Sequence, residues 1–100
     1  MTSDEFAEAA SRYVADPALA SLIRERVAGP GREQYEQDED TQRVEVVEVD
    51  GLVTDVREEI ADAIVYAAAL HMRGGEGAML VVGYLSRAWA ALGDIRVPEG

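Results

Sequence analysis

The 100-residue chain contains no cysteine, no lysine and no asparagine, and it has a single histidine. Without cysteine there is no disulfide framework, no thiolate nucleophile and no cysteine-based zinc site. With one histidine, neither a histidine-rich metal site nor a Ser-His-Asp triad is expected. Alanine is abundant while lysine and asparagine are missing, a bias typical of a GC-rich genome or of its virus. Carboxylates are left as the main candidates for chemistry.

Positive charge is also scarce, because nine arginines face 20 aspartates and glutamates and give a net charge of −11. Direct binding to a nucleic-acid backbone is therefore not expected, since it requires clustered basic residues. The acidic start, Met-Thr-Ser-Asp-Glu-Phe, lacks the features of a signal peptide. The apolar runs 63–72 and 78–85 are too short to span a membrane. We expect a cytoplasmic protein, in the host cytoplasm if the chain is phage-encoded.

The length predicts one small domain over residues 1–100. Helical periodicity and caps predict N-terminal helices within 1–31, and a C-terminal helical pair within 54–93 is followed by a tail over 94–100. The intervening segment 32–53 is acidic and ends in β-branched residues, with Asp50-Gly51 as a favoured hairpin turn. The predicted fold class is mainly α, with three or four helices and a short β-hairpin near 43–53.

The last predicted helix, over about 77–92, is apolar on nearly every side. One core in so small a chain cannot surround such a helix, so a second subunit is expected to cover it. We therefore predict a homodimer that pairs through the last two helices. Trp89 is expected in the core or in that interface.

The segment 55–66 carries the strongest functional signal in the chain. At about 100° per residue, its four carboxylates lie within about 100° of one another on one helix face: Asp55, Glu58, Glu59 and Asp62. Like charges repel, so this face is either solvated or holds something positive. Mg²⁺ is the obvious candidate for the second reading, because it prefers oxygen ligands and retains water molecules for a phosphate substrate.

The run Glu58-Glu59-x-x-Asp62, followed by Ala-Ile-Val-Tyr-Ala, resembles the second metal-binding helix of the MazG-like, all-α NTP pyrophosphohydrolases, which include small phage-encoded members. The resemblance covers about residues 55–70. It implies Mg²⁺ held by Glu58 or Glu59 together with Asp62, and a first carboxylate pair on another segment. Glu33-x-x-Glu36 is the best local match for that pair, and Glu5-x-x-Glu8 is a rival. No residue is assigned as the catalytic base.

Two functions remain open from the sequence. The first is a Mg²⁺-dependent nucleotide pyrophosphohydrolase, in which Tyr66 could stack on the base of the substrate or simply lie in the core. The second is a non-catalytic acidic protein that binds a host protein or mimics nucleic acid. His71 falls away from the carboxylates, so we expect a packed or helix-end histidine rather than a catalyst. A second acidic helix facing 55–62 would favour the enzyme.

Overall fold

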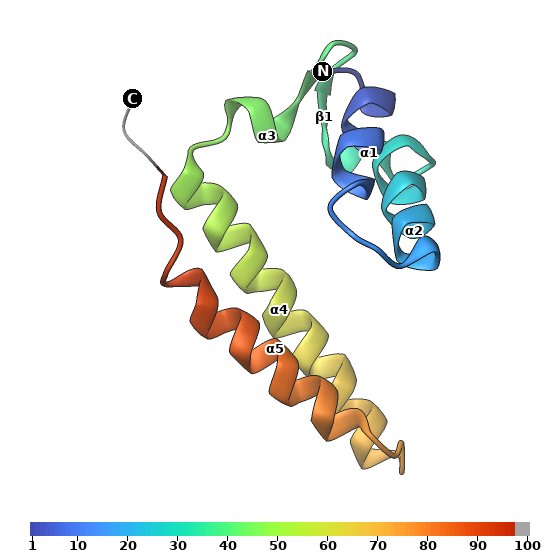
Figure 1. Ribbon diagram of the computed structural model, residues 1–100, viewed down its shortest axis with the longest axis vertical. Helices are drawn as coiled ribbons and strands as arrows, with labels where there is room; N and C mark the ends of the chain where they lie inside the picture. The colour runs from blue at the N-terminus through green and yellow to red at the C-terminus, as the bar shows by residue number, and fades with distance from the viewer. Residues whose placement is uncertain (98–100) are drawn as a thin grey trace. The chain divides into compact units, whose positions relative to one another are not determined.

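The computed structural model describes residues 1–97, which form two compact units (Figure 1). The N-terminal unit comprises residues 1–47, and the C-terminal unit begins at Glu48. Five α-helices and one two-stranded antiparallel sheet occur in the described residues. The expected fold class, mainly α with a short β-hairpin, is therefore confirmed. The single domain over 1–100 stays a prediction, and residues 98–100 of the expected tail lie outside the described residues.

Helices α1 (Ser3–Ser11) and α2 (Pro17–Ala28) pack together in the N-terminal unit. Thr2 caps α1 in a capping box with Glu5, while the Asp16 carboxylate caps α2 by accepting from the Leu19 N–H at 2.9 Å. Each cap satisfies a backbone donor that the first helical turn leaves unpaired. The contact buries small side chains, Ala7, Ala20 and Val27. Small residues let the two helices approach closely.

A 3-10 turn (Arg32–Gln34) leads into the hairpin of β1 (Glu36–Asp38) and β2 (Thr41–Gln42). Gln42 is fully buried, and its Nε2 donates to Ser3 Oγ at 3.2 Å and to the Met1 carbonyl at 3.4 Å. Because these partners precede or begin α1, the buried amide ties the hairpin to the first helix. The hairpin thus belongs to the N-terminal unit.

The hairpin expected near 43–53 is wrong in position. Residues Arg43–Val46 form the short helix α3, and Val49 already begins α4 (Val49–Met72). At the start of α3, the Glu45 carboxylate accepts from the Gln42 N–H, and in α4 Asp50 lies in the positively polarised first turn. Strand propensity depends on a partner strand and on burial. In segment 43–53, the contacts at the starts of α3 and α4 favour helix instead.

The C-terminal unit is an antiparallel pair of α4 and α5 (Ala78–Leu92). Gly74, with φ of +86°, ends α4 in a Schellman motif, in which the Gly75 N–H donates to the Leu70 carbonyl at 2.8 Å. Among the described residues of this unit, the buried apolar ones are Ile60, Ala67 and Ala78. The helical pair predicted within 54–93 is confirmed, although its first helix begins earlier, at Val49. No helix among residues 1–97 is long and apolar enough to span a membrane.

The N-terminal unit should lose stability in acid. The Gln42 backbone N–H and the N-terminal ammonium hold the pKa of Glu45 below its ordinary value of 4.5, and bonds from Thr2 do the same for the pKa of Glu5. A lowered folded-state pKa stabilises the fold above the unfolded value, and this stabilisation is lost as the pH falls through the folded value. We therefore expect the thermal midpoint, measured by circular dichroism, to fall below about pH 4.5.

Glu45→Gln provides the control for this prediction. At pH 7 the variant should melt below the original protein, because it lacks the carboxylate that meets the ammonium at 3.0 Å. At pH 3 the gap between the two midpoints should be smaller than at pH 7, since protonation of Glu45 weakens its contacts with the ammonium and the Gln42 N–H. A gap between the midpoints that is the same at both pH values would contradict the assignment.

Candidate metal-binding face of helix α4

The four carboxylates of the predicted metal site lie on one exposed face of α4, and we call this the acidic face: Asp55, Glu58, Glu59 and Asp62. Ile60 and Ala67 on the same helix are buried. At about 100° per residue, the centre of the acidic face is about 130° to 150° from the direction of these buried side chains. The pairing with α5 therefore turns the acidic face to solvent, where hydrated cations can reach it.

Arg57 is the one arginine inside α4, and it does not neutralise the acidic face. Its guanidinium lies over the ring of Trp89 on α5, 5.6 Å from the centroid. This cation–π contact holds Arg57 on the other side of the helix pair. The spacing would also allow Arg57 to pair with a carboxylate on the surface of α4, but Arg57 does not adopt that arrangement. Within the C-terminal unit, the acidic face consequently keeps its negative charge uncompensated by Arg57.

Glu33 and Glu36 lie in the N-terminal unit, Glu33 exposed in the 3-10 turn and Glu36 half-buried at the start of β1. Glu36 has partners within that unit. Its Oε2 accepts from Ser3 Oγ at 3.2 Å and lies 3.7 Å from Arg32 Nε. In this arrangement Glu36 joins the hairpin to α1, so ligation by Glu36 would require it to exchange these partners for a metal ion.

The rival pair, Glu5 and Glu8, is also engaged locally. Glu5 accepts from the Thr2 N–H in the capping box, and Glu8 lies 3.5 Å from Arg12 Nε. Within neither unit do three or more His, Asp or Glu side chains of the described residues form a group that could hold a metal ion. The acidic face therefore offers ligands spread along one helix, and its completion by Glu33 and Glu36 stays a prediction.

Tyr66 follows Asp62 by one helical turn and is 73% exposed, so its ring is available for stacking rather than buried in the core. His71 lies in the last turn of α4 and is exposed, on the part of the helix nearest the loop to α5. A cation there interacts favourably with the helix C-terminus. The interpretation of His71 as a helix-end residue is consistent with this position.

A pocket of about 450 Å³, which is not predicted from the sequence, lies at the open end of the helix pair. It is lined by the first turns of α4, including Thr54 and Arg57, and by Leu92 and Ile95 at the end of α5 and beyond. The signal that could have indicated it is the apolar spacing of Ile95 and Val97 in the predicted tail, which favours packing over free solvation.

Comparisons with protein-family models, with curated proteins and with solved structures found no match to this chain.

Proposed function

We propose that the chain is a Mg²⁺-dependent pyrophosphohydrolase of nucleoside triphosphates. The observation that carries the proposal is the acidic face, in which four carboxylates share one exposed side of a long helix that α5 anchors. Carboxylate oxygens are the ligands that Mg²⁺ prefers, and an exposed site leaves room for retained waters and for phosphate. When bound, the metal would polarise the phosphates and lower the pKa of an attacking water.

The residues of α4 would have distinct roles in this proposal. Glu58 or Glu59, together with Asp62, would bind the metal, because residues three or four positions apart share a helix face. Tyr66 would stack on the nucleobase one turn further along. Two or three ligands from one helix bind Mg²⁺ weakly, so Glu33 and Glu36 would complete the site. A nucleotide substrate would be met in the cytoplasm, which is the host cytoplasm for a phage-encoded chain.

Calorimetric titration with Mn²⁺, with and without a nonhydrolysable nucleoside triphosphate analogue, tests the proposal. We expect a saturable metal-binding signal that becomes tighter when the analogue is present, because its phosphates supply the remaining oxygen ligands. Incubation with Mg²⁺ and a mixture of nucleoside triphosphates should release pyrophosphate and nucleoside monophosphate, read by phosphorus NMR. Binding that is indifferent to the analogue, together with no pyrophosphate, would overturn the enzyme assignment.

A second candidate is a non-catalytic protein whose acidic surface docks to a basic partner, such as a host protein. It is favoured by the exposure of all four carboxylates and by the net charge of −11. Complementary charge would speed association and make binding sensitive to salt. The two candidates differ in their metal dependence. Capture of a basic host protein that persists in EDTA and weakens with salt would favour this second function.

A further inference from the structure

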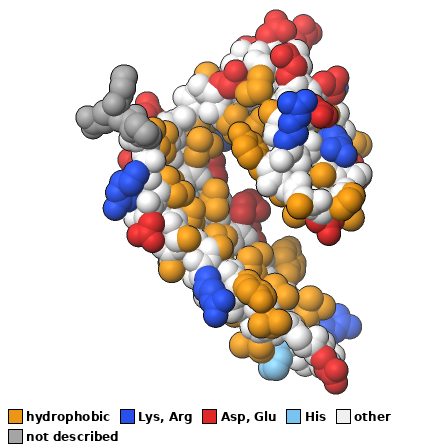
Figure 2. Space-filling model, in the orientation of Figure 1, with side chains coloured by type: hydrophobic (Ala, Val, Ile, Leu, Met, Phe, Trp, Pro, Cys, Tyr) orange, Lys and Arg blue, Asp and Glu red, His pale blue; other side chains and the backbone are white. Residues whose placement is uncertain are grey.

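One face of the α4–α5 pair carries exposed apolar side chains from both helices. On α4 these are Val56, Tyr66 and Leu70, and on α5 they are Val81 and Tyr84, with exposed fractions of 45%, 73%, 61%, 49% and 60%. In both helices these residues lie to the same side of the buried contact made by Ile60, Ala67 and Ala78, at about 100° per residue. We call this surface the apolar face. Figure 2 shows hydrophobic side chains running along the helix pair.

An exposed apolar surface formed by two packed helices is uncommon on a soluble monomer, where such patches usually mark an interface. Single exposed apolar residues are ordinary, but here two helices contribute to one surface. α5 has 15 residues and is about 22 Å long, enough to form one side of a four-helix bundle. The apolar face therefore requires an occupant with a matching apolar surface of similar length.

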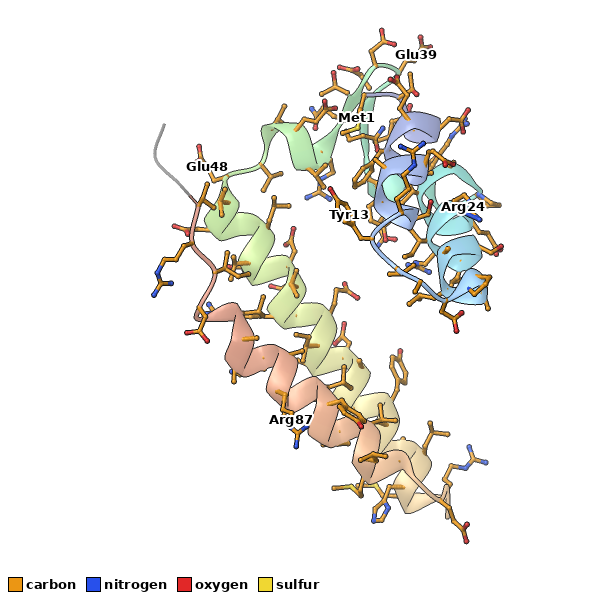
Figure 3. The ribbon with its side chains drawn as sticks, in the orientation of Figure 1. Met1, Tyr13, Arg24, Glu39, Glu48 and Arg87 are labelled. Atoms are coloured by element: carbon orange, nitrogen blue, oxygen red, sulfur yellow. The ribbon has the colours of Figure 1, made fainter. Side chains whose placement is uncertain are left out.

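The charges at the edge of this face indicate which occupant fits. The acidic face lies toward the outer edge of α4, with Glu59 between the directions of Tyr66 and Leu70 at about 100° per residue. By contrast, α5 contains no Asp or Glu and carries one charged residue, Arg87. Figure 3 shows Arg87 projecting from α5 on the side away from α4. Each hairpin thus has one acidic edge and one basic edge, a distribution that is complementary to itself when the hairpin is rotated by 180°.

The heights of these charges along the helices also match. Arg57 on α4 contacts Trp89 on α5, so those residues lie at similar heights in the antiparallel pair. Glu59 lies two residues after Arg57, and Arg87 lies two residues before Trp89. Because α4 and α5 run antiparallel and both rise by about 1.5 Å per residue, Arg87 is level with Glu59. A rotation about an axis parallel to the helices preserves height. It would therefore bring Arg87 of one copy level with Glu59 and Asp62 of another.

We propose that the apolar face binds a second copy of this chain, forming an antiparallel four-helix bundle in which α4 of each copy lies against α5 of the other. Each Arg87 then borders Glu59 and Asp62 of the opposite copy and supplies the positive charge that α4 lacks on its acidic face. The other two-fold arrangement, with α4 against α4, would juxtapose the two acidic faces and is opposed by repulsion between like charges. This assembly does not rest on the proposed hydrolysis and competes with it, because it covers Tyr66 and pairs Glu59 and Asp62 with Arg87. It is therefore measured without metal or nucleotide.

Sedimentation equilibrium tests the pairing, with a matched pair of variants. The original protein should sediment at about twice its chain mass of 10.8 kDa. Tyr66→Glu places a carboxylate in the apolar face and should weaken dimerisation by roughly a hundredfold or more, because burying an unpaired charge is unfavourable. Val65→Glu changes the neighbouring residue, which is 66% exposed and points about 100° away from Tyr66, outside the apolar face, and should leave the dimer intact. Both positions are exposed, so the helical circular dichroism of each variant should be unchanged.

A charge swap tests the orientation of the two copies. Arg87→Glu and Glu59→Arg should each weaken the dimer by about tenfold, since each removes two symmetry-related attractions and introduces repulsion. The double variant should recover most of the lost affinity. Combining Glu59→Arg with Arg57→Glu should not, because Arg57 lies over Trp89 on the other side of the pair.

Three results would overturn the proposal. A monodisperse monomer at high concentration would assign the apolar face to another segment of the chain. A dimer insensitive to Tyr66→Glu would place the contact elsewhere. Single charge variants that weaken the dimer without recovery in the double variant would exclude α4 against α5.

Discussion

Replacing Asp62 by alanine is expected to lower the affinity for Mn²⁺ by roughly a hundredfold or more, because the proposed site would lose a carboxylate that binds the metal directly. The fold should persist and become slightly more stable. Asp62 is exposed on a helix whose other carboxylates repel it, and alanine has the higher helix propensity. Calorimetric titration gives the affinity, and thermal unfolding followed by circular dichroism gives the stability.

Glu76→Ala is the matched control, since it removes another exposed carboxylate of the same unit, from the loop between α4 and α5. It changes the net charge as much as Asp62→Ala does but should leave the metal affinity unchanged. Equal Mn²⁺ binding by the original protein and both variants would remove Asp62 from the metal site. Equal losses in both variants would indicate a general effect of charge rather than ligation.

Replacing Ile60 by alanine is expected to lower the free energy of unfolding by about 2–5 kcal/mol, the range for a large-to-alanine substitution in a core. Ile60 is 8% exposed and is the largest buried apolar side chain among residues 48–97, where the other buried residues are alanines. Ala67 and Ala78 cannot expand to fill the space that the substitution leaves. Chemical denaturation followed by circular dichroism should show a lower midpoint with a similar slope.

Val65→Ala serves as the control, five residues along the same helix, with its side chain 66% exposed. It should change the free energy of unfolding by less than about 0.5 kcal/mol, as surface substitutions usually do. A midpoint for Ile60→Ala that matches that of Val65→Ala would show that α4 does not pack on α5 through Ile60.

Local signals predicted most of the helices correctly. Asp16 before Pro17 combines a cap with a residue suited to the first helical position, and the structure begins α2 at Pro17. The glycines at 74 and 75 end α4 because the backbone there adopts a left-handed conformation and approaches the Leu70 carbonyl closely. These features act within a few residues, so sequence alone is sufficient to read them.

The position of the two strands was predicted wrongly, and the contacts of Gln42 show the physical reason. The valine-rich segment 43–49 has strand propensity, yet the strands form at Glu36–Asp38 and Thr41–Gln42. There the turn is closed by the Asp38 carboxylate, which accepts from the Asp40 N–H at 2.9 Å, and Gln42 is buried next to Ser3. The contact with Ser3 joins residues 39 apart in the chain. No local pattern encodes such a contact.

The sequence by itself determined which residues can share the acidic face, because helical periodicity alone places Asp55, Glu58, Glu59 and Asp62 on one side of α4. It also determined the scarcity of positive charge that makes this face unusual. Only the tertiary structure decided whether the acidic face contacts solvent or another part of the protein. Ile60 and Ala67 pack in the buried contact of the helix pair, which leaves the carboxylates in solvent. Arg57 stacks on Trp89, so the arginine nearest in sequence does not contact them. Burial and side-chain partners depend on elements far apart in the chain, which periodicity within one helix does not specify.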